Sequence, residues 1–146
     1  MRDQWLELLE SSDYDWRGRD QPASEPDLEA LASYFGRPLP ADYETFLRRW
    51  SGCEVAYRDV WTMRLWSAHD IPIWSRVYGF TPERILGAMP FGDNGGGEAL
   101  VFDTRPEHAD GKYLIVAINF VSIAWNEALP VADGFRELLQ LRRPLL

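Results

Sequence analysis

The spacing of apolar residues changes along the chain from a helical period to a strand period, and this change constrains the fold most. The helical spacings are those of Leu28, Leu31 and Phe35 and of Tyr43, Phe46, Leu47 and Trp50. From Val60 to Trp66 the period becomes two, as in a half-buried strand: Trp61, Met63 and Leu65 alternate with Thr62 and Arg64. Helices grouped around a run of strands, without regular strand–helix alternation, favour an α+β fold over a doubly wound one.

End signals support both early helices. Ser24 and Asp27 resemble a capping box, and Gly36 can adopt the left-handed conformation that ends a helix. Pro40 suits the first position of the next helix, and Gly52 is expected to stop it. The sequence therefore predicts two consecutive helices with defined ends.

The two ends of the chain also carry helical patterns. Trp5, Leu8 and Leu9 fall at i, i+3 and i+4, which predicts a short amphipathic helix at the N-terminus. Residues 12–26 are rich in Asp, Arg, Gly, Pro and Ser and are predicted to form a loop. A final helix is expected to begin with Asp133 as its N-cap, because apolar side chains follow it at helical spacing.

Three short apolar runs, at residues 88–91, 98–103 and 112–118, indicate further strands. The third run is apolar on both faces, so we expect it to lie centrally in the sheet with helices on at least one side. Segment 67–78 has near-helical spacing, and Pro72 limits that helix to a start at or just before it. The prediction is a mostly antiparallel sheet of about four to six strands packed against N-terminal and C-terminal helices.

Composition predicts one folded domain over residues 1–146, with residues 1–24 as an N-terminal helix and loop. The chain is 46% hydrophobic and holds seven Trp, seven Phe and six Tyr, which can fill a core without metals or disulfides. The net charge of −8 disfavours nucleic acid and anionic membranes and suggests a cationic partner. Cys53 is the single cysteine, and the sequence shows no signal peptide or membrane span, so a cytoplasmic location is expected.

The glycine run at residues 95–97 invites two ligand interpretations, and both fail on detail. A phosphate loop needs a following Gly-Lys-Ser/Thr, and Asp93 and Glu98 would repel phosphate. A calcium loop needs acidic ligands at alternate positions, where this chain has glycines. We therefore expect a tight loop whose positive φ angles require glycine.

Catalytic and metal sites have weak support. His69, His108 and Cys53 lie in different segments without zinc-ligand spacing, and no nucleophile signature surrounds Cys53. A buried, inert thiol is the expectation there. We predict no cofactor and no enzymatic activity; a small hydrolase built from Asp93, Glu98 and either histidine remains the least favoured hypothesis.

Four blocks in fixed order carry a resemblance to a known family. They are Leu39–Leu47 ending in Ser51-Gly52, then Arg64-Leu65-Trp66 with Asp70-Ile71, then Pro90–Arg105, and last Val131–Phe135 before Leu138-Leu139. Together they resemble the SUKH superfamily, the Smi/Knr-type domain, over roughly residues 25–140. One departure is Gly134, where many relatives have Ser at the start of the final helix.

The resemblance implies a mixed α+β domain that binds other proteins. In fungi the namesakes regulate cell-wall synthesis, and many bacterial members are immunity proteins that neutralise a toxin from neighbouring cells. The first hypothesis is therefore an immunity protein for a cationic toxin domain, possibly a nuclease. The second is a cytosolic regulatory or scaffold module without a toxin partner. Exposed aromatics among acids would serve either role, and the candidate partner-binding residues are Trp74, Tyr78, Asp93, Asn94, Glu98 and Trp125.

Overall fold

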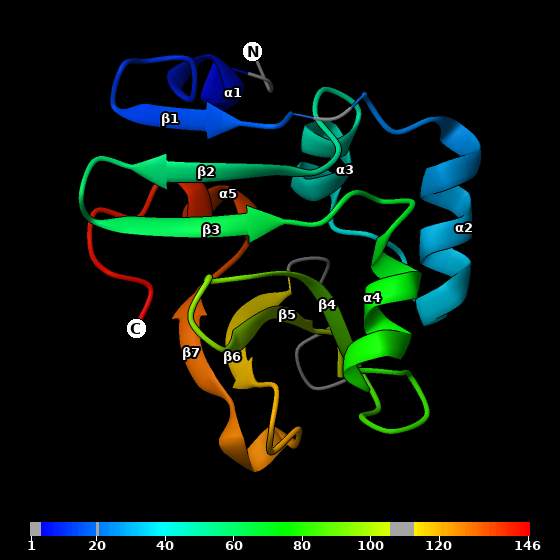
Figure 1. Cartoon of the computed structure of the whole chain (residues 1–146). Helices are drawn as coiled ribbons and strands as arrows, with labels where there is room; N and C mark the ends of the chain where they lie inside the picture. The colour runs from blue at the N-terminus through cyan, green and yellow to red at the C-terminus, as the bar shows by residue number, and fades with distance from the viewer. Residues whose placement is uncertain (1–3, 20, 106–112) are drawn as a thin grey trace.

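Seven strands form one antiparallel sheet whose order in space is their order in the chain, β1 to β7 (Figure 1). The structure is a computed structural model that describes residues 4–19, 21–105 and 113–146. The strands are β1 Tyr14–Arg17, β2 Cys53–Tyr57, β3 Trp61–Leu65, β4 Ala88–Asp93, β5 Glu98–Asp103, β6 Leu114–Asn119 and β7 Leu129–Ala132. The helices are α1 Gln4–Leu8, α2 Glu25–Phe35, α3 Ala41–Leu47, α4 Ile71–Tyr78 and α5 Phe135–Leu139, with the 3-10 turn η2 at Trp125–Glu127.

The α+β class is confirmed, but the predicted strand number is too low. The segment predicted as a loop over residues 12–26 contains β1, which pairs with β2 along its whole length. Strand β2 was missed although Cys53, Val55 and Tyr57 alternate with less buried residues. Strand β7 contains Pro130, which lacks a backbone donor and is tolerated here because β7 is an edge strand.

The capping of α2 is as predicted. Ser24 accepts a hydrogen bond from the Asp27 amide, the Asp27 side chain accepts one from Ser24, and Gly36 ends the helix in the left-handed region. Helix α3 differs, because Pro40 is its N-cap and it ends near Arg48. Gly52 (φ 90°) instead turns the chain into β2.

Helix α5 is capped by another helix. Its N-cap is Gly134 and not Asp133, and neither side chain caps it. The Asp42 carboxylate of α3 accepts a hydrogen bond from the Arg136 amide at 2.9 Å. A tertiary contact therefore supplies the oxygen that a serine would provide locally.

Two apolar clusters cover the two faces of the sheet. The larger lies between the sheet and α1, α3 and α5, with close ring contacts among Tyr43, Phe91, Phe102 and Phe135. The smaller lies on the other face of β4–β6 and includes Phe80, Val101 and Ile118. Strands β4 and β5 are thus buried on both faces, whereas β6, predicted as central, lies one strand from the edge.

The N-terminal helix buries a different set of side chains from the one predicted. Trp5, Leu6 and Leu9 are buried, while Leu8 is 59% exposed. Two hydrogen bonds from aromatic side chains of β1 fix the N-terminal segment: one joins β1 to α5, and the other joins β1 to the residue after α1. The Tyr14 hydroxyl donates to the Leu139 carbonyl at 2.8 Å, and Trp16 Nε1 donates to the Leu9 carbonyl at 2.7 Å.

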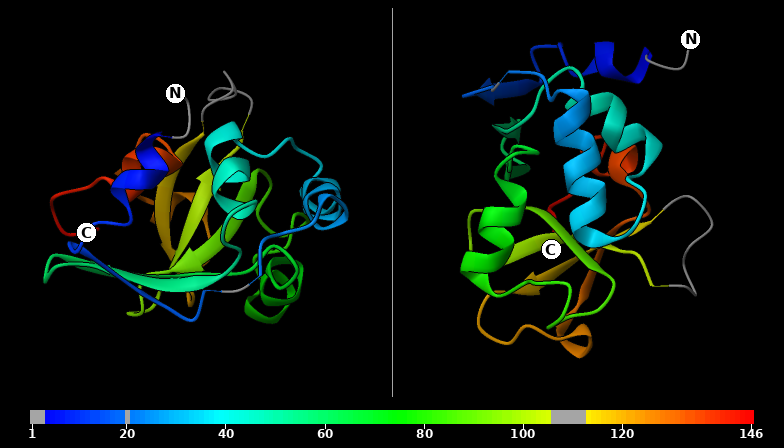
Figure 2. Two further views of the ribbon diagram at one scale, coloured as in Figure 1. Left: turned by 90° about the horizontal axis from the view of Figure 1, so that it is seen from above. Right: turned by 90° about the vertical axis from the view of Figure 1, so that its right-hand side faces the viewer.

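The front of β1–β3 is open. Helices α1, α3 and α5 lie behind these strands, and α2 and α4 lie to one side (Figures 1 and 2). On β2 and β3 the residues that face forward, including Glu54, Thr62 and Arg64, are exposed. None of the described helices is long and apolar enough to cross a bilayer.

Removing the hydroxyl group should affect the stability of the domain differently at two buried tyrosines, Tyr43 and Tyr14. Tyr43 OH is fully buried without a hydrogen-bond partner among the described residues, and burial raises the pKa of this hydroxyl. Tyr43→Phe should leave the free energy of unfolding unchanged or raise it by up to about 1 kcal/mol, whereas Tyr14→Phe should lower it by about 1 kcal/mol. Urea unfolding followed by tryptophan fluorescence measures both. Equal losses would show that Tyr43 OH is hydrogen-bonded after all.

Gly92 should tolerate no side chain. A Cβ added there would overlap the Arg64 carbonyl oxygen on β3. Gly92→Ala should lower the free energy of unfolding by about 1–3 kcal/mol, because backbone on both sides must move. Gly96→Ala is the matched control, since its Cβ would meet Asn94 Oδ1 at an ordinary 3.5 Å. A control as costly as Gly92→Ala would rule out this packing explanation.

Candidate functional site

Helix α4 buries Ile71 but turns its other large apolar side chains to solvent. Ile73, Trp74, Val77 and Tyr78 are all exposed, with Val77 at 63%. The polar Ser75 faces the interior, where its hydroxyl donates to the Phe80 carbonyl at 2.6 Å. Ile71 and the hydrogen-bonded Ser75 thus form the inward side of α4, and the exposed apolar residues lie on its outward side.

The exposed side of α4 continues into a row of stacked rings that we call the aromatic ledge. It consists of Trp66, Trp74, Tyr78 and Phe120. Tyr78 is central: its ring centroid lies 5.9 Å from Trp66, 5.6 Å from Trp74 and 4.6 Å from Phe120. Trp74 and Tyr78 are the exposed rings, and the buried Trp66 and half-buried Phe120 support Tyr78, so the exposed rings are held at a low cost in side-chain entropy.

Asp93 fixes the position of the ledge. This carboxylate is 8% exposed. Its Oδ2 accepts from Trp66 Nε1 at 3.1 Å, and its Oδ1 accepts from Arg64 Nε at 3.2 Å and from the Gly95 amide at 2.8 Å. One buried anion therefore orients a ring of the ledge, a charged side chain and the start of a loop.

The loop after Asp93 is held by its own side chains. Asn94 Oδ1 accepts from the amides of Gly96 and Glu98, and Asn94 Nδ2 donates to Glu98 Oε1 at 2.8 Å. Gly95 and Gly97 have φ angles of 76° and 122°, which confirms the predicted requirement for glycine. The Phe120 amide donates to the Gly97 carbonyl at 3.1 Å, so the loop also supports the ledge.

A groove of about 470 Å³ runs along the open front of the sheet beside the ledge. The lining residues that matter here are Arg17, Glu54 and Arg64 from the strands, Trp66, Trp74 and Tyr78 from the ledge, and Asp93. The groove thus has an aromatic wall and a charged floor.

The structure brings most of the candidate partner-binding residues together. Trp74, Tyr78 and Asp93 line the same groove, and Asn94 and Glu98 form the loop attached to it. Trp125 belongs elsewhere: its Nε1 donates to the Leu86 carbonyl at 2.9 Å, and the Arg105 guanidinium lies 4.1 Å from its ring centroid. These contacts give Trp125 a structural position.

Sequence reasoning missed the other parts of the groove and of the ledge. Trp66 belongs to a block that resembles the family, which was the available signal, but nothing in the sequence pairs it with Asp93. Arg17, Glu54 and Phe120 had no local signal. Their position follows from strand register and from a loop contact.

Of the two histidines considered for a hydrolase, the described one, His69, is not gathered with Asp93 and Glu98. His69 is exposed, lies 3.2 Å from Asp70 and lines a separate hollow that neither Asp93 nor Glu98 reaches. His108 lies outside the described residues. Cys53 is buried, as expected for a structural thiol. Over the described ranges, no cluster of three His, Cys, Asp or Glu side chains could hold a metal ion.

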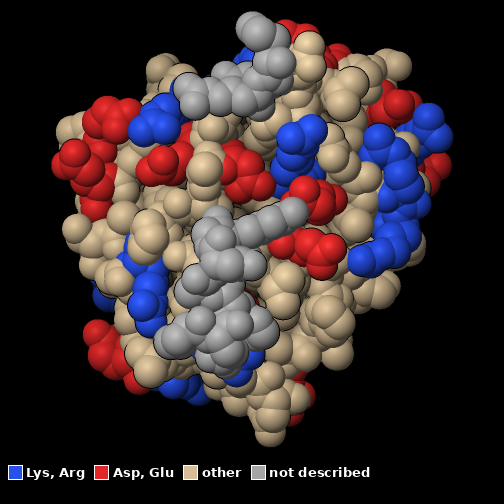
Figure 3. All heavy atoms as spheres, turned by 180° about the vertical axis from the view of Figure 1, so that it is seen from behind, with Lys and Arg blue, Asp and Glu red and all other residues tan. Residues whose placement is uncertain are grey.

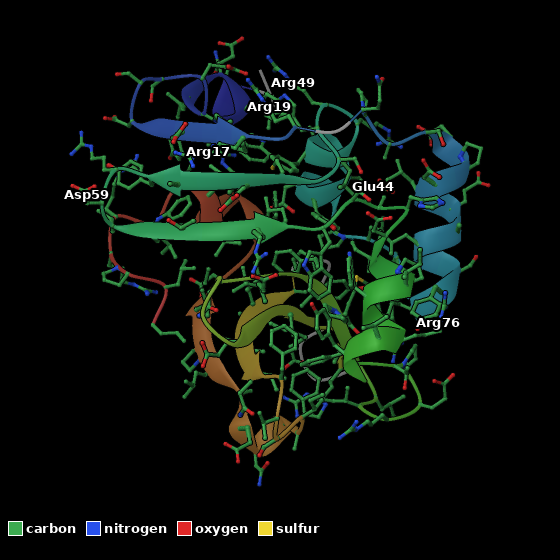
Figure 4. The ribbon with its side chains drawn as sticks, viewed as in Figure 1. Arg17, Arg19, Glu44, Arg49, Asp59 and Arg76 are labelled. Carbon is green, nitrogen blue, oxygen red and sulfur yellow. The ribbon has the colours of Figure 1, made fainter. Side chains whose placement is uncertain are left out.

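Removing the Asp93 carboxylate should destabilise the domain. Asp93→Ala leaves Trp66 Nε1 and the Gly95 amide without their acceptor, which should lower the free energy of unfolding by about 2–3 kcal/mol. Asp59→Ala is the control, because Asp59 is exposed in the turn between β2 and β3 (Figure 4). Chemical unfolding measures both. A cost for Asp93→Ala no larger than for the control would contradict this role.

Comparison with known proteins identifies a family for the chain. A search among curated proteins finds no match to the chain. The profile of the SMI1 / KNR4 family (SUKH-1) matches residues 22–141, which include α2 to α5 and β2 to β7. The chain therefore belongs to the SMI1 / KNR4 family (SUKH-1).

Proposed function

We propose that the chain is an immunity protein that binds a toxin domain through the aromatic ledge and neutralises it without catalysis. The observation that carries the proposal is the exposed ledge beside a groove. Within the ledge Trp74 and Tyr78 are 38% and 41% exposed, and Val77, which lies beside them on α4, is 63% exposed. Contiguous apolar surface of this kind on a monomer marks an interaction site, and Trp and Tyr dominate binding energy at interfaces.

The ledge is suited to binding because it is preorganised. Stacking on Tyr78 and the hydrogen bond from Trp66 to Asp93 fix the rings before any partner arrives. Little side-chain entropy is then lost on association, so more of the contact energy contributes to affinity.

Net charge supports a cationic partner. The charge of −8 would speed the approach of a basic domain and slow that of an acidic one. On the back of the molecule, both acidic and basic side chains are present among the described residues (Figure 3). We therefore assign the long-range attraction to the whole molecule and the specific contacts to the front.

Family membership supports toxin neutralisation over other binding roles, because immunity proteins form a large part of the superfamily that the chain resembles. The protein would act in the bacterial cytoplasm and would cover the toxin's substrate cleft or hold it in an inactive form. A regulatory module of the fungal type would use the same kind of surface on a different partner.

Co-expression with toxin domains encoded beside the gene tests the proposal. The wild-type chain should co-purify with one of them and abolish its toxicity. Trp74→Ala/Tyr78→Ala should weaken binding by about 2–4 kcal/mol, measured by calorimetry, because both rings are central to the ledge. Leu8→Ala is the matched control, an exposed apolar side chain on α1.

Two outcomes would contradict the proposal. Capture of a host regulator without any neighbouring toxin would favour the scaffold function. If the double variant and Leu8→Ala both bind the toxin as tightly as the wild type, the ledge is not part of the interface.

A further inference from the structure

A row of alternating charge crosses the first four strands on the open front. Arg17 on β1 lies opposite Glu54 on β2, Glu54 lies opposite Arg64 on β3, and Arg64 lies opposite Asp93 on β4. Directly opposed residues project from the same face of a sheet. We call these four residues the charge row; its order is positive, negative, positive, negative.

Asp93 is fully hydrogen-bonded, but Arg17, Glu54 and Arg64 keep polar atoms that can bind a partner. The side chains of Arg17 and Arg64 are 73% and 60% exposed. Arg64 uses its Nε for Asp93, and Arg17 pairs with Asp15 on its own strand. Glu54 lies opposite two arginines, yet within the described part of the chain its carboxylate forms neither an ion pair nor a hydrogen bond. The charge row therefore has polar atoms that are not used within the domain and can bind a partner.

The charge row lies where a partner can reach it. All four residues line the groove whose wall is the aromatic ledge. No described helix covers the front of β1–β3, and Figure 4 marks Arg17 beside β1 and β2 on this part of the sheet. Arg76 on α4 is not part of this surface, because it lies toward α2 with its guanidinium 5.5 Å from the Tyr34 ring centroid (Figure 4).

The spacing of the row indicates what could lie on it. Adjacent strands are about 4.8 Å apart, whereas side chains on one face of a single strand repeat at about 6.6 Å. Side chains three or four residues apart on a helix are separated by about 5–6 Å. A helix laid across the strands therefore matches the row better than an added strand does.

We propose that the charge row binds a partner helix that carries an acidic, a basic and an acidic side chain on successive turns. The acids contact Arg17 and Arg64, the base contacts Glu54, and a neighbouring apolar side chain rests on the ledge. The row itself is neutral, so it selects the order of charges and not the net charge. This inference rests on the proposed protein-binding function and specifies which surface of the partner is read.

Two synthetic helical peptides test the inference without an identified toxin. They share one apolar face and carry either Glu-Lys-Glu or Lys-Glu-Lys at positions i, i+4 and i+7. Amide shifts of the labelled protein give both dissociation constants. The Glu-Lys-Glu peptide should bind at least about threefold more tightly, because three exposed pairs are favourable in one order and unfavourable in the other. Attraction by the net charge of −8 predicts the reverse preference.

Charge reversals complete the test. Arg64→Glu and Glu54→Arg should each reduce the preference for Glu-Lys-Glu. Arg136→Glu on α5 and Glu29→Arg on α2 change the net charge equally, away from the row, and should preserve it. Thermal melts confirm that the variants fold. Equal binding of both peptides, preference for Lys-Glu-Lys, or binding of neither would overturn the inference. A toxin that binds through the ledge regardless of these reversals would leave the immunity function intact and refute only the charge row.

Discussion

Strands β1–β3 and strands β4–β7 form two halves of the sheet, which meet only where β3 pairs with β4. The groove, the aromatic ledge and the charge row all depend on this short contact. Strands β3 and β4 share only the pairs Arg64–Asp93 and Leu65–Gly92, whereas β5 and β6 pair over six residues. The missing side chain of Gly92 lets the backbones approach there, and the Asp93 carboxylate then holds Arg64 and Trp66 from the other half. Because that contact is short, each of these interactions contributes directly to the relative position of the two halves.

This contact also places the ledge and the charge row side by side. The row is a consequence of register in β1–β4, and the ledge is a consequence of α4, which connects β3 to β4. Asp93 belongs to both, as the last charge of the row and as the acceptor for Trp66. A single buried carboxylate thereby couples the polar and apolar parts of the proposed binding surface.

Patterns among residues close in sequence predicted the fold class and helix α2. The features that they did not predict depend on contacts between residues far apart in the sequence. Helix α2 carries its own caps at Ser24 and Gly36, so its limits could be read from residues close in sequence. Strands β1 and β7 have four residues each, too few for an alternating pattern to stand out. The start of α5 was misplaced because its capping oxygen belongs to Asp42, far away in the sequence.

The same distinction applies to the site. Trp74, Tyr78 and Asp93 were predicted from residue type, since exposed aromatics among acids are typical of interfaces. Their common groove could not be predicted. A register shift of one residue would send Glu54 or Arg64 to the opposite face of the sheet, and the sequence does not specify that register.

Strand β1 precedes the residues matched by the family profile, yet it supplies Arg17 to the groove. This edge strand pairs on one side only, but its Tyr14 belongs to the main core cluster and its Trp16 packs against it. Outward-facing positions of β1 such as Arg17 can therefore change the groove while the inward-facing Tyr14 and Trp16 keep the strand in place.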